Sequence, residues 1–147
     1  MKIESKEFND LSVQELYSIL KIRQEVFIIE QNCNYLDCDN LDLNATHIYI
    51  KEDLKLIAYL RIIKPNIVSK NAILGRILVD NGRRKQNIGK KIISYAIKLI
   101  KHNYPNVSIE MSAQAYLIDF YNQFGFNISG KEYLEDDILH IKMIKKI

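Results

Sequence analysis

The segment between Ile73 and Met111 limits the fold most strongly, because it reads as strand, helix and strand in direct succession. Ile73 to Val79 is a short apolar run, and Val107 to Met111 is a second one. Between them, apolar residues recur at helical spacing, namely Ile88, Ile92, Ile93, Ala96, Leu99 and Ile100. The sequence "NYPN" then ends the helix. Strands joined through a helix pair in parallel, so we predict one parallel crossover.

The flanking segments predict the other elements of an α+β domain. Ser12 and Glu15 form a capping-box pattern, followed by an amphipathic helix that reaches Phe27. A second short helix, Tyr116 to Phe124, ends at Gly125. The remaining strands are predicted at Thr46 to Lys51, Leu56 to Ile63, Asn127 to Tyr133 and Ile138 to Ile144. The first two of these strands form a hairpin through "KEDLK". Because 147 residues suit one domain, we predict a single α+β domain over residues 1–147.

Composition argues against several classes of protein. With 48% hydrophobic and 27% charged residues, the net charge of +3 is too small to indicate a nucleic-acid partner. No apolar run approaches the ~18 residues of a membrane span, so no membrane partner is predicted. Cys33 and Cys38 lack the second pair that a zinc site needs, so we predict no metal. Reduced thiols and an N-terminus without a signal-peptide pattern predict a cytoplasmic protein.

The stretch "RRKQNIGKKII", Arg83 to Ile93, lies between the predicted strand and helix of the crossover. It carries five cations, and no acid occurs from Asn81 through Ile109. One interpretation is a basic helix face in water. The other is an anion site, because a helix N-terminus offers unpaired N–H groups and a partial positive charge to a phosphate. Gly89 would let a ligand approach the backbone, and Asn87 tolerates positive φ.

Three motifs resemble one known superfamily. "ILVDNGRRKQNIG" resembles the strand and the Arg-x-x-Gly-x-Gly pyrophosphate loop of the GNAT superfamily of acetyl-CoA-dependent N-acetyltransferases. Arg84 and Gly89 match that loop, whereas Asn87 stands where the first glycine usually is. "AQAYLIDFYNQFGF" resembles the second GNAT signature, and "RQEVFIIEQNCNYLDCDNLD", followed by a histidine, resembles the ElaA branch. The resemblance implies a mostly antiparallel twisted sheet with a V-shaped splay between its central strands, flanked by about four helices.

The resemblance also implies acetyl-CoA as co-substrate. The pyrophosphate would bind the backbone N–H groups from Arg84 to Lys90, and the pantetheine arm would pair with the strand at Ile77 and Val79. The Val79 N–H would then stabilise the oxyanion that develops on the acetyl carbonyl. Gln114 stands where many relatives carry an asparagine that contacts the arm. The implied cofactor-binding residues are Ile77, Leu78, Val79, Arg84, Lys85, Gln86, Asn87, Ile88, Gly89, Lys90, Gln114, Phe120 and Tyr121.

Tyr121 occupies the position from which the family's tyrosine protonates the departing thiolate. A phenol is a weaker acid than a thiol, so we expect Tyr121 to donate a hydrogen bond first and to transfer its proton late. The structural alternative is that Tyr121 only packs on Phe124 or Phe126.

The segment from Gln24 through Ile50 contains no Lys or Arg. Its acids, Glu25, Glu30, Asp37, Asp39 and Asp42, predict a cationic acceptor amine, although a solvated acidic loop also accounts for them. An ammonium must lose a proton before it attacks, and Glu30 is our first candidate base and His47 our second. Cys33 or Cys38 as an acyl carrier would need an adjacent base. His140 could face the acceptor from the last hairpin or simply pack in the sheet.

These observations predict an N-acetyltransferase that moves an acetyl group from acetyl-CoA directly to a primary amine of a small molecule or peptide, as a monomer or homodimer. One alternative is a regulatory module that binds acyl-CoA without turnover. A nucleic-acid-binding protein is the other alternative, and the acidic Gln24 to Ile50 segment argues against it.

Overall fold

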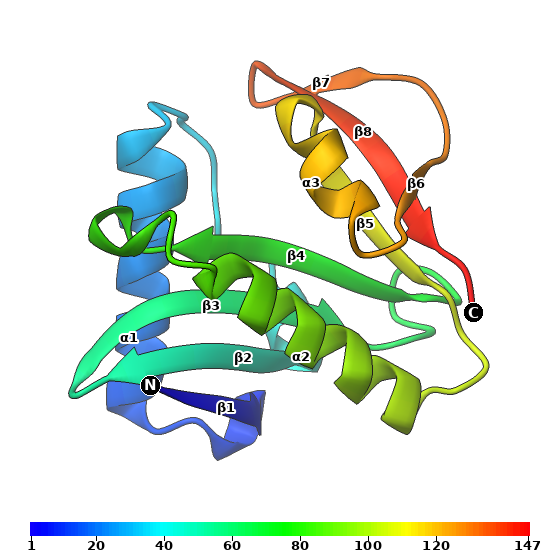
Figure 1. Ribbon diagram of the computed structural model, residues 1–147. Coiled ribbons are helices and arrows are strands. Elements are labelled where there is room, and N and C mark those ends of the chain that lie inside the picture. Colours follow the sequence, from blue (N-terminus) through cyan, green and yellow to red (C-terminus); the bar gives the residue numbers. More distant parts are fainter.

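One mixed eight-stranded sheet, bent at its centre, organises the chain, whose computed structural model describes residues 1–147 (Figure 1). The strands are β1 (Lys2–Glu7), β2 (Ala45–Glu52), β3 (Lys55–Ile63), β4 (Ala72–Val79), β5 (Ile109–Gln114), β6 (Asn127–Ile128), β7 (Tyr133–Glu135) and β8 (Ile138–Lys145). Their order is β1-β2-β3-β4-β5-β8-β6, and β7 also pairs with β8. Only β4 and β5 are parallel, which confirms the predicted crossover and the mostly antiparallel sheet.

Three α-helices flank the sheet, where about four helices were expected. They are α1 (Val13–Arg23), α2 (Ile88–Asn103) and α3 (Ile118–Asn122). The predicted capping box starts α1, because Ser12 accepts from the Glu15 N–H and Glu15 accepts from the Ser12 N–H. Beyond α1 the helix widens into π-type turns over Gln24–Glu30, so the predicted single helix changes its geometry before Phe27. Such wide turns re-aim the side chains that follow them.

The two long helices cover opposite faces of the sheet (Figure 1). Ile48 and Ile50 of β2 belong to the larger core cluster, which contains the buried face of α2. Tyr49, between them, belongs to the smaller cluster with Ile19 and Ile22 of α1. Because side chains alternate along a strand, the nearly continuous apolar runs of β2 and β3 fill both cores.

The sheet opens between β4 and β5, where their pairing is short (Figure 1). Only two registered pairs join these strands, Ala72 with Ile109 and Ile73 with Glu110. The residues that follow on both strands diverge, which confirms the V-shaped splay. Unpaired backbone N–H and C=O groups therefore line the inner edge of β4.

Some elements depart from the predictions. β1 was not predicted, since "KIESKE" is mostly polar and becomes a strand only as the edge partner of β2. The predicted strand from Asn127 to Tyr133 is divided into β6 and β7, which are separated by Gly130 with φ of 120°. No helix in the structure has the length and apolar character needed to cross a membrane.

Candidate active site

The splay contains a cavity of about 720 Å³ that lies between the α2 N-terminus, β4, β5 and α3. Most of the residues implied as binding or catalytic line it. They are Glu30, Ile77, Leu78, Val79, Arg84, Lys85, Asn87, Ile88, Gly89, Lys90, Gln114, Phe120 and Tyr121. Two do not: Gln86 accepts a hydrogen bond from Arg83 outside the cavity, and His47 lies elsewhere. The structure thus gathers segments distant in sequence around one opening, while the individual roles stay predictions.

The loop before α2 leaves the helix N-terminus open to a ligand. Asn87, the N-cap, has φ of 62°, a left-handed conformation that explains how it replaces the family's glycine. No side chain caps this helix, in contrast to Ser12 at the start of α1. The first N–H groups of α2 therefore remain available for an anion, beside Lys85 and Lys90 in the same cavity wall.

The basic loop is partly compensated by acids from other segments. Arg83 forms an ion pair with Glu52 at the end of β2. Arg84 donates from Nε to the Val79 carbonyl at 3.1 Å and from Nη2 to Glu30 at 2.6 Å. The Arg84–Glu30 pair thus links the cofactor loop to the π-helical segment across the cavity. Sequence distance hid both pairs, so the predicted uncompensated block is smaller than it looked.

The Val79 N–H points into the splay. The Asp80 N–H donates to the Ile57 carbonyl of β3 at 2.8 Å. Because successive N–H groups of a strand point to opposite sides, the N–H groups of Val79 and Ile77 face away from β3. An extended ligand in the splay would find these donors in place.

Tyr121 is packed on its sides and free at its hydroxyl. Its ring makes edge contacts with Phe120 at 5.3 Å and Phe126 at 6.4 Å between centroids, so the packing alternative holds for the ring. No protein group hydrogen-bonds the hydroxyl, although the residue is only 6% exposed and lines the cavity. Burial, with a smaller effect of Tyr116, raises the pKa of Tyr121 to about 12. The phenol is therefore neutral at physiological pH and presents an unused donor to the cavity.

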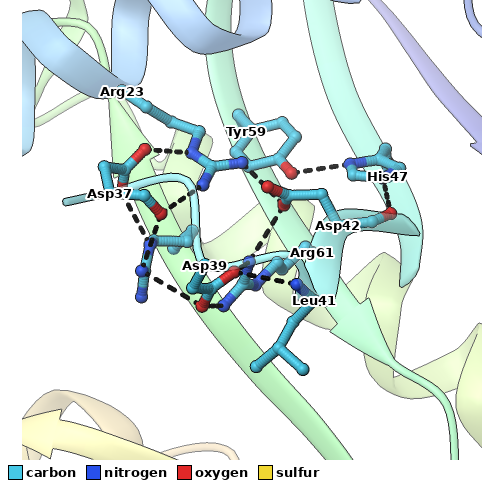
Figure 2. Close-up of polar contacts among 9 residues, drawn as sticks. Arg23, Asp37, Asp39, Leu41, Asp42, His47, Tyr59 and Arg61 are labelled. Carbon is cyan, nitrogen blue, oxygen red and sulfur yellow. Dashed lines mark hydrogen bonds and ion pairs between the residues drawn. The ribbon is translucent and has the colours of Figure 1, made fainter. Parts of the chain in front are cut away.

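His47, the second candidate base, sits in a structural network outside the cavity (Figure 2). Its ring is fully buried. Nε2 lies 2.9 Å from the Asp42 carbonyl and Nδ1 lies 2.7 Å from the Tyr59 hydroxyl. A carbonyl can only accept, so Nε2 donates and Nδ1 accepts from Tyr59. Burial lowers the pKa of His47, which keeps it neutral. The structure therefore gives His47 no route to an acceptor.

The acids of the predicted acceptor loop are mostly paired with buried arginines (Figure 2). Arg23 of α1 is fully buried between Asp37 at 2.7 Å and Asp42 at 2.7 Å. Arg61 of β3 pairs with Asp42 at 2.9 Å and Asp39 at 2.6 Å. Neither predicted interpretation of these three acids is therefore correct. They hold the loop onto α1 and the sheet, and they do not line the cavity.

The same loop grips a bulge in β4. Tyr59 pairs with Leu78 but Arg61 pairs with Gly75, so one extra residue of β4 opposes Leu60. Arg76, in the bulge, has φ of 52°, a conformation that costs an ordinary residue roughly 1–2 kcal/mol. Its guanidinium donates from Nε to Asp37 Oδ1 at 2.7 Å and from Nη2 to the Asp37 carbonyl at 3.1 Å. Gly75 inside a strand pattern was the one sequence signal for this bulge.

The bulge predicts an inverted order of stability at position 76. In an ordinary strand, alanine is more stable than glycine by about 0.5–1 kcal/mol. Because position 76 has positive φ, we expect Arg76→Gly to be more stable than Arg76→Ala by about 1 kcal/mol. Urea unfolding of the two variants measures the difference. A more stable alanine variant would show that β4 lacks this bulge.

The opposite cavity wall contains polar residues that the sequence did not assign to a site. Glu135 and Asp136, at the turn between β7 and β8, line the cavity together with His140 and Ser112. Cys33 also lines it, and its thiol lies 3.5 Å from the Asp136 carbonyl. Only the pairing of β5 with β8 brings these residues opposite the cofactor loop, and their positions in the chain gave no signal of it.

Comparison with known proteins agrees with this geometry. A family model for the acetyltransferase (GNAT) domain matches residues 11–147. The chain belongs to the GNAT family. The GNAT chain is 36% identical to the protein ElaA of Escherichia coli over 95% of its own length and 92% of that protein. The ElaA crystal structure superposes with a TM-score of 0.93 over 99% of this chain and 100% of that one. The predicted resemblance to the ElaA branch is confirmed.

Two further solved structures relate this GNAT fold to acyl-CoA chemistry. An acyl-CoA N-acyltransferase from Pseudomonas aeruginosa is 33% identical, with a TM-score of 0.95 over 99% of both chains. An aminoglycoside 6'-N-acetyltransferase solved with coenzyme A shares the fold, with a TM-score of 0.71 over 99% of this chain and 97% of that one, at 16% identity. Membership of the GNAT family supports an acyltransferase activity for this chain.

Proposed function

We propose that this protein is an acetyl-CoA-dependent N-acetyltransferase that acetylates a primary amine by direct attack in a ternary complex. The observation that carries the proposal is the cavity in the splay, where an uncapped helix N-terminus, free strand donors and an unused tyrosine hydroxyl meet. A thioester donor needs these three features for its phosphates, its carbonyl oxygen and its leaving sulfur, respectively.

The residues of the cavity suit the successive parts of coenzyme A. The pyrophosphate would lie on the N–H groups of the Arg84 to Lys90 loop, and Lys85 and Lys90 would add attraction. The arm would pair with Ile77 and Val79 as an added strand, beside Gln114 on β5. The Val79 N–H would then donate to the oxyanion when the amine attacks.

A cationic acceptor stays part of the proposal, although on different residues from those expected. Asp37, Asp39 and Asp42 are neutralised by arginines and cannot attract a ligand charge. Glu135 and Asp136 line the cavity, and the Glu135 side chain is half exposed. They would attract an ammonium group toward the thioester side of the opening.

A turnover assay tests the proposal most directly. Purified protein is incubated with acetyl-CoA and a panel of amines, such as polyamines, amino-sugars and lysine peptides, and the released thiol is measured. We expect acetylation of at least one cationic amine. Tight donor binding without turnover of any amine would contradict the enzyme and favour the acyl-CoA-binding module. Tyr121 has no evident task in such a module.

Gly89 gives a test of the phosphate cradle that does not depend on knowing the acceptor. A Cβ at Gly89 would only touch Phe120 at 3.7 Å and Val79 at 3.8 Å, so Gly89→Ala should keep acetyl-CoA affinity. Gly89→Asp adds a negative charge at the helix N-terminus, and we expect at least about tenfold weaker binding, the equivalent of 1.4 kcal/mol. Isothermal titration with acetyl-CoA measures both.

The matched control is Gly82→Asp, which puts the same charge in the same loop but outside the cavity. We expect its effect on acetyl-CoA affinity to be much smaller. Equal affinities for wild type and Gly89→Asp would show that the phosphates bind elsewhere.

A further inference from the structure

His140 lies on the acceptor side of the sheet, across from the cofactor loop. On β5 and β8 the pairs Met111 with Met143 and Ala113 with Ile141 point into the main core. The alternating pair, Gln114 with His140, therefore points to the opposite face. His140 is 7% exposed and lines the cavity, as its neighbour Gln114 does.

The surroundings of His140 fix which of its nitrogens faces a substrate. Nδ1 lies 2.7 Å from the Ile138 carbonyl, which can only accept, so Nδ1 carries a proton. In the neutral ring Nε2 then holds the lone pair. Glu135 Oε2 lies 3.4 Å from Nε2, and the Tyr133 ring stacks on the imidazole with centroids 6.2 Å apart. A proton taken by Nε2 would therefore form an imidazolium stabilised by a carboxylate and a carbonyl.

The other basic candidates are occupied. The Glu30 carboxylate, our first candidate from the sequence, holds the Arg84 guanidinium at 2.6 Å. His47 is buried outside the cavity, with both nitrogens engaged. Among the histidines only His140 combines a place in the cavity wall with a lone pair that no protein donor occupies.

We propose that His140 is the general base that deprotonates the acceptor ammonium, with Glu135 holding the imidazolium that results. This role rests on the proposed N-acetyltransferase function. His140 Nε2 takes one proton from the ammonium and passes it to water. The neutral nitrogen attacks the thioester carbon and forms the C–N bond. As the C–S bond breaks, Tyr121 gives its proton to sulfur, and the excess proton of the new amide nitrogen returns to Tyr121 through water.

The test uses two amines that wild type acetylates and that differ in basicity. One is an alkylamine, protonated at neutral pH, and the other an alkoxyamine or arylamine, which is already unprotonated. We expect His140→Gln to lower kcat/KM for the alkylamine by about 10- to 100-fold, near the lower end for general bases because cavity water can substitute. The loss should be clearly smaller for the weakly basic amine. Acetyl-CoA affinity, measured by titration, should not change.

Three comparisons make the result decisive. His102→Gln, at an exposed position of α2, is the matched control and should behave as wild type. Equal loss for both amines, or no loss, in His140→Gln would overturn the role of His140. A basicity-dependent loss in Glu30→Gln with normal His140→Gln would transfer the role to Glu30.

A variant that fails to fold is covered by Glu135→Gln, whose half-exposed side chain contacts the ring only through the Nε2 pair. We expect it to show the same dependence on basicity with a smaller loss, and an equal rate for both amines would count against the proposal. Donor binding without wild-type turnover of any amine would overturn the proposed function itself. Wild-type turnover with an unimpaired His140→Gln would overturn only this inference.

Discussion

Replacing Asp42 by alanine should destabilise the fold by about 3–5 kcal/mol, the usual cost of leaving a buried ion unpaired. Asp42 Oδ1 accepts from Arg23 at 2.7 Å and from Arg61 at 2.9 Å, and both arginines are almost fully buried. Arg61 Nε is already a buried donor without a partner, so the cluster has little capacity to compensate. For a chain of this size, we expect a fall in Tm of roughly 10 °C in a thermal melt.

Glu4→Ala is the matched control for this loss of stability. Glu4 pairs with Lys2 at 3.8 Å and Lys51 at 3.7 Å near the surface, so its removal should cost less than about 1 kcal/mol. If Asp42→Ala and Glu4→Ala melt at similar temperatures, the arginine cluster does not hold the loop in place.

The same cluster predicts how stability depends on pH. Burial alone would raise the pKa of Asp39, but hydrogen bonds and charge from Arg61 hold it at about 2. The pKa of Asp42 is also lowered, because Arg23 and Arg61 outweigh burial. Folded-state values below the unfolded value near 3.8 mean that this stabilisation is present above about pH 4. It should be lost as the pH falls from about 4 toward 2, which acid unfolding followed by circular dichroism measures.

Tyr121→Phe should lower kcat by about 100-fold while acetyl-CoA affinity changes little. The change keeps the ring contacts with Phe120 and Phe126 and removes only the free hydroxyl. With a pKa of about 12 against about 8.5 for an ordinary thiol, proton transfer from Tyr121 is uphill by roughly 5 kcal/mol. Transfer must therefore follow charge build-up on sulfur, which favours the lower end of the range for general acids.

The measurement compares wild type and Tyr121→Phe at saturating donor with one amine from the panel. Tyr116→Phe is the control, since it is an exposed tyrosine beside the same cavity. A donor whose leaving thiol is more acidic should shrink the defect, because its sulfur needs a proton less. Unchanged kcat would remove Tyr121 from the mechanism, and a large loss of donor affinity would make its hydroxyl a binding group.

Local patterns in the sequence predicted much of the fold, because each pattern depends on residues close in the chain. The Ser12 and Glu15 capping box, the α2 stripe from Ile88 to Ile100 and the crossover that contains it all followed from spacing and are confirmed. The cofactor loop was found for the same reason, since its strand, turn and helix start are contiguous. Asn87 is an example, because its tolerance of positive φ could be inferred from residue type.

Charge interpretation failed where pairing partners lie far apart in the chain. The acids Asp37, Asp39 and Asp42 looked like an acceptor loop because their arginine partners include Arg61 and Arg76 on later strands. In the same way, nothing near Arg84 in the sequence indicated its pair with Glu30. Whether a charge attracts a ligand or is neutralised internally depends on distances in space.

The sequence by itself determined the family, the parallel crossover and the phosphate loop, since helical period, capping and turn chemistry act over a few residues. The tertiary structure alone decided which side chains share the cavity. The β5–β8 pairing sets His140 beside Gln114, and the bulge gripped by Asp37 shapes β4 where it faces the splay. Strand pairing and splay join residues far apart in the chain, and a one-residue change of register would turn each side chain to the other face.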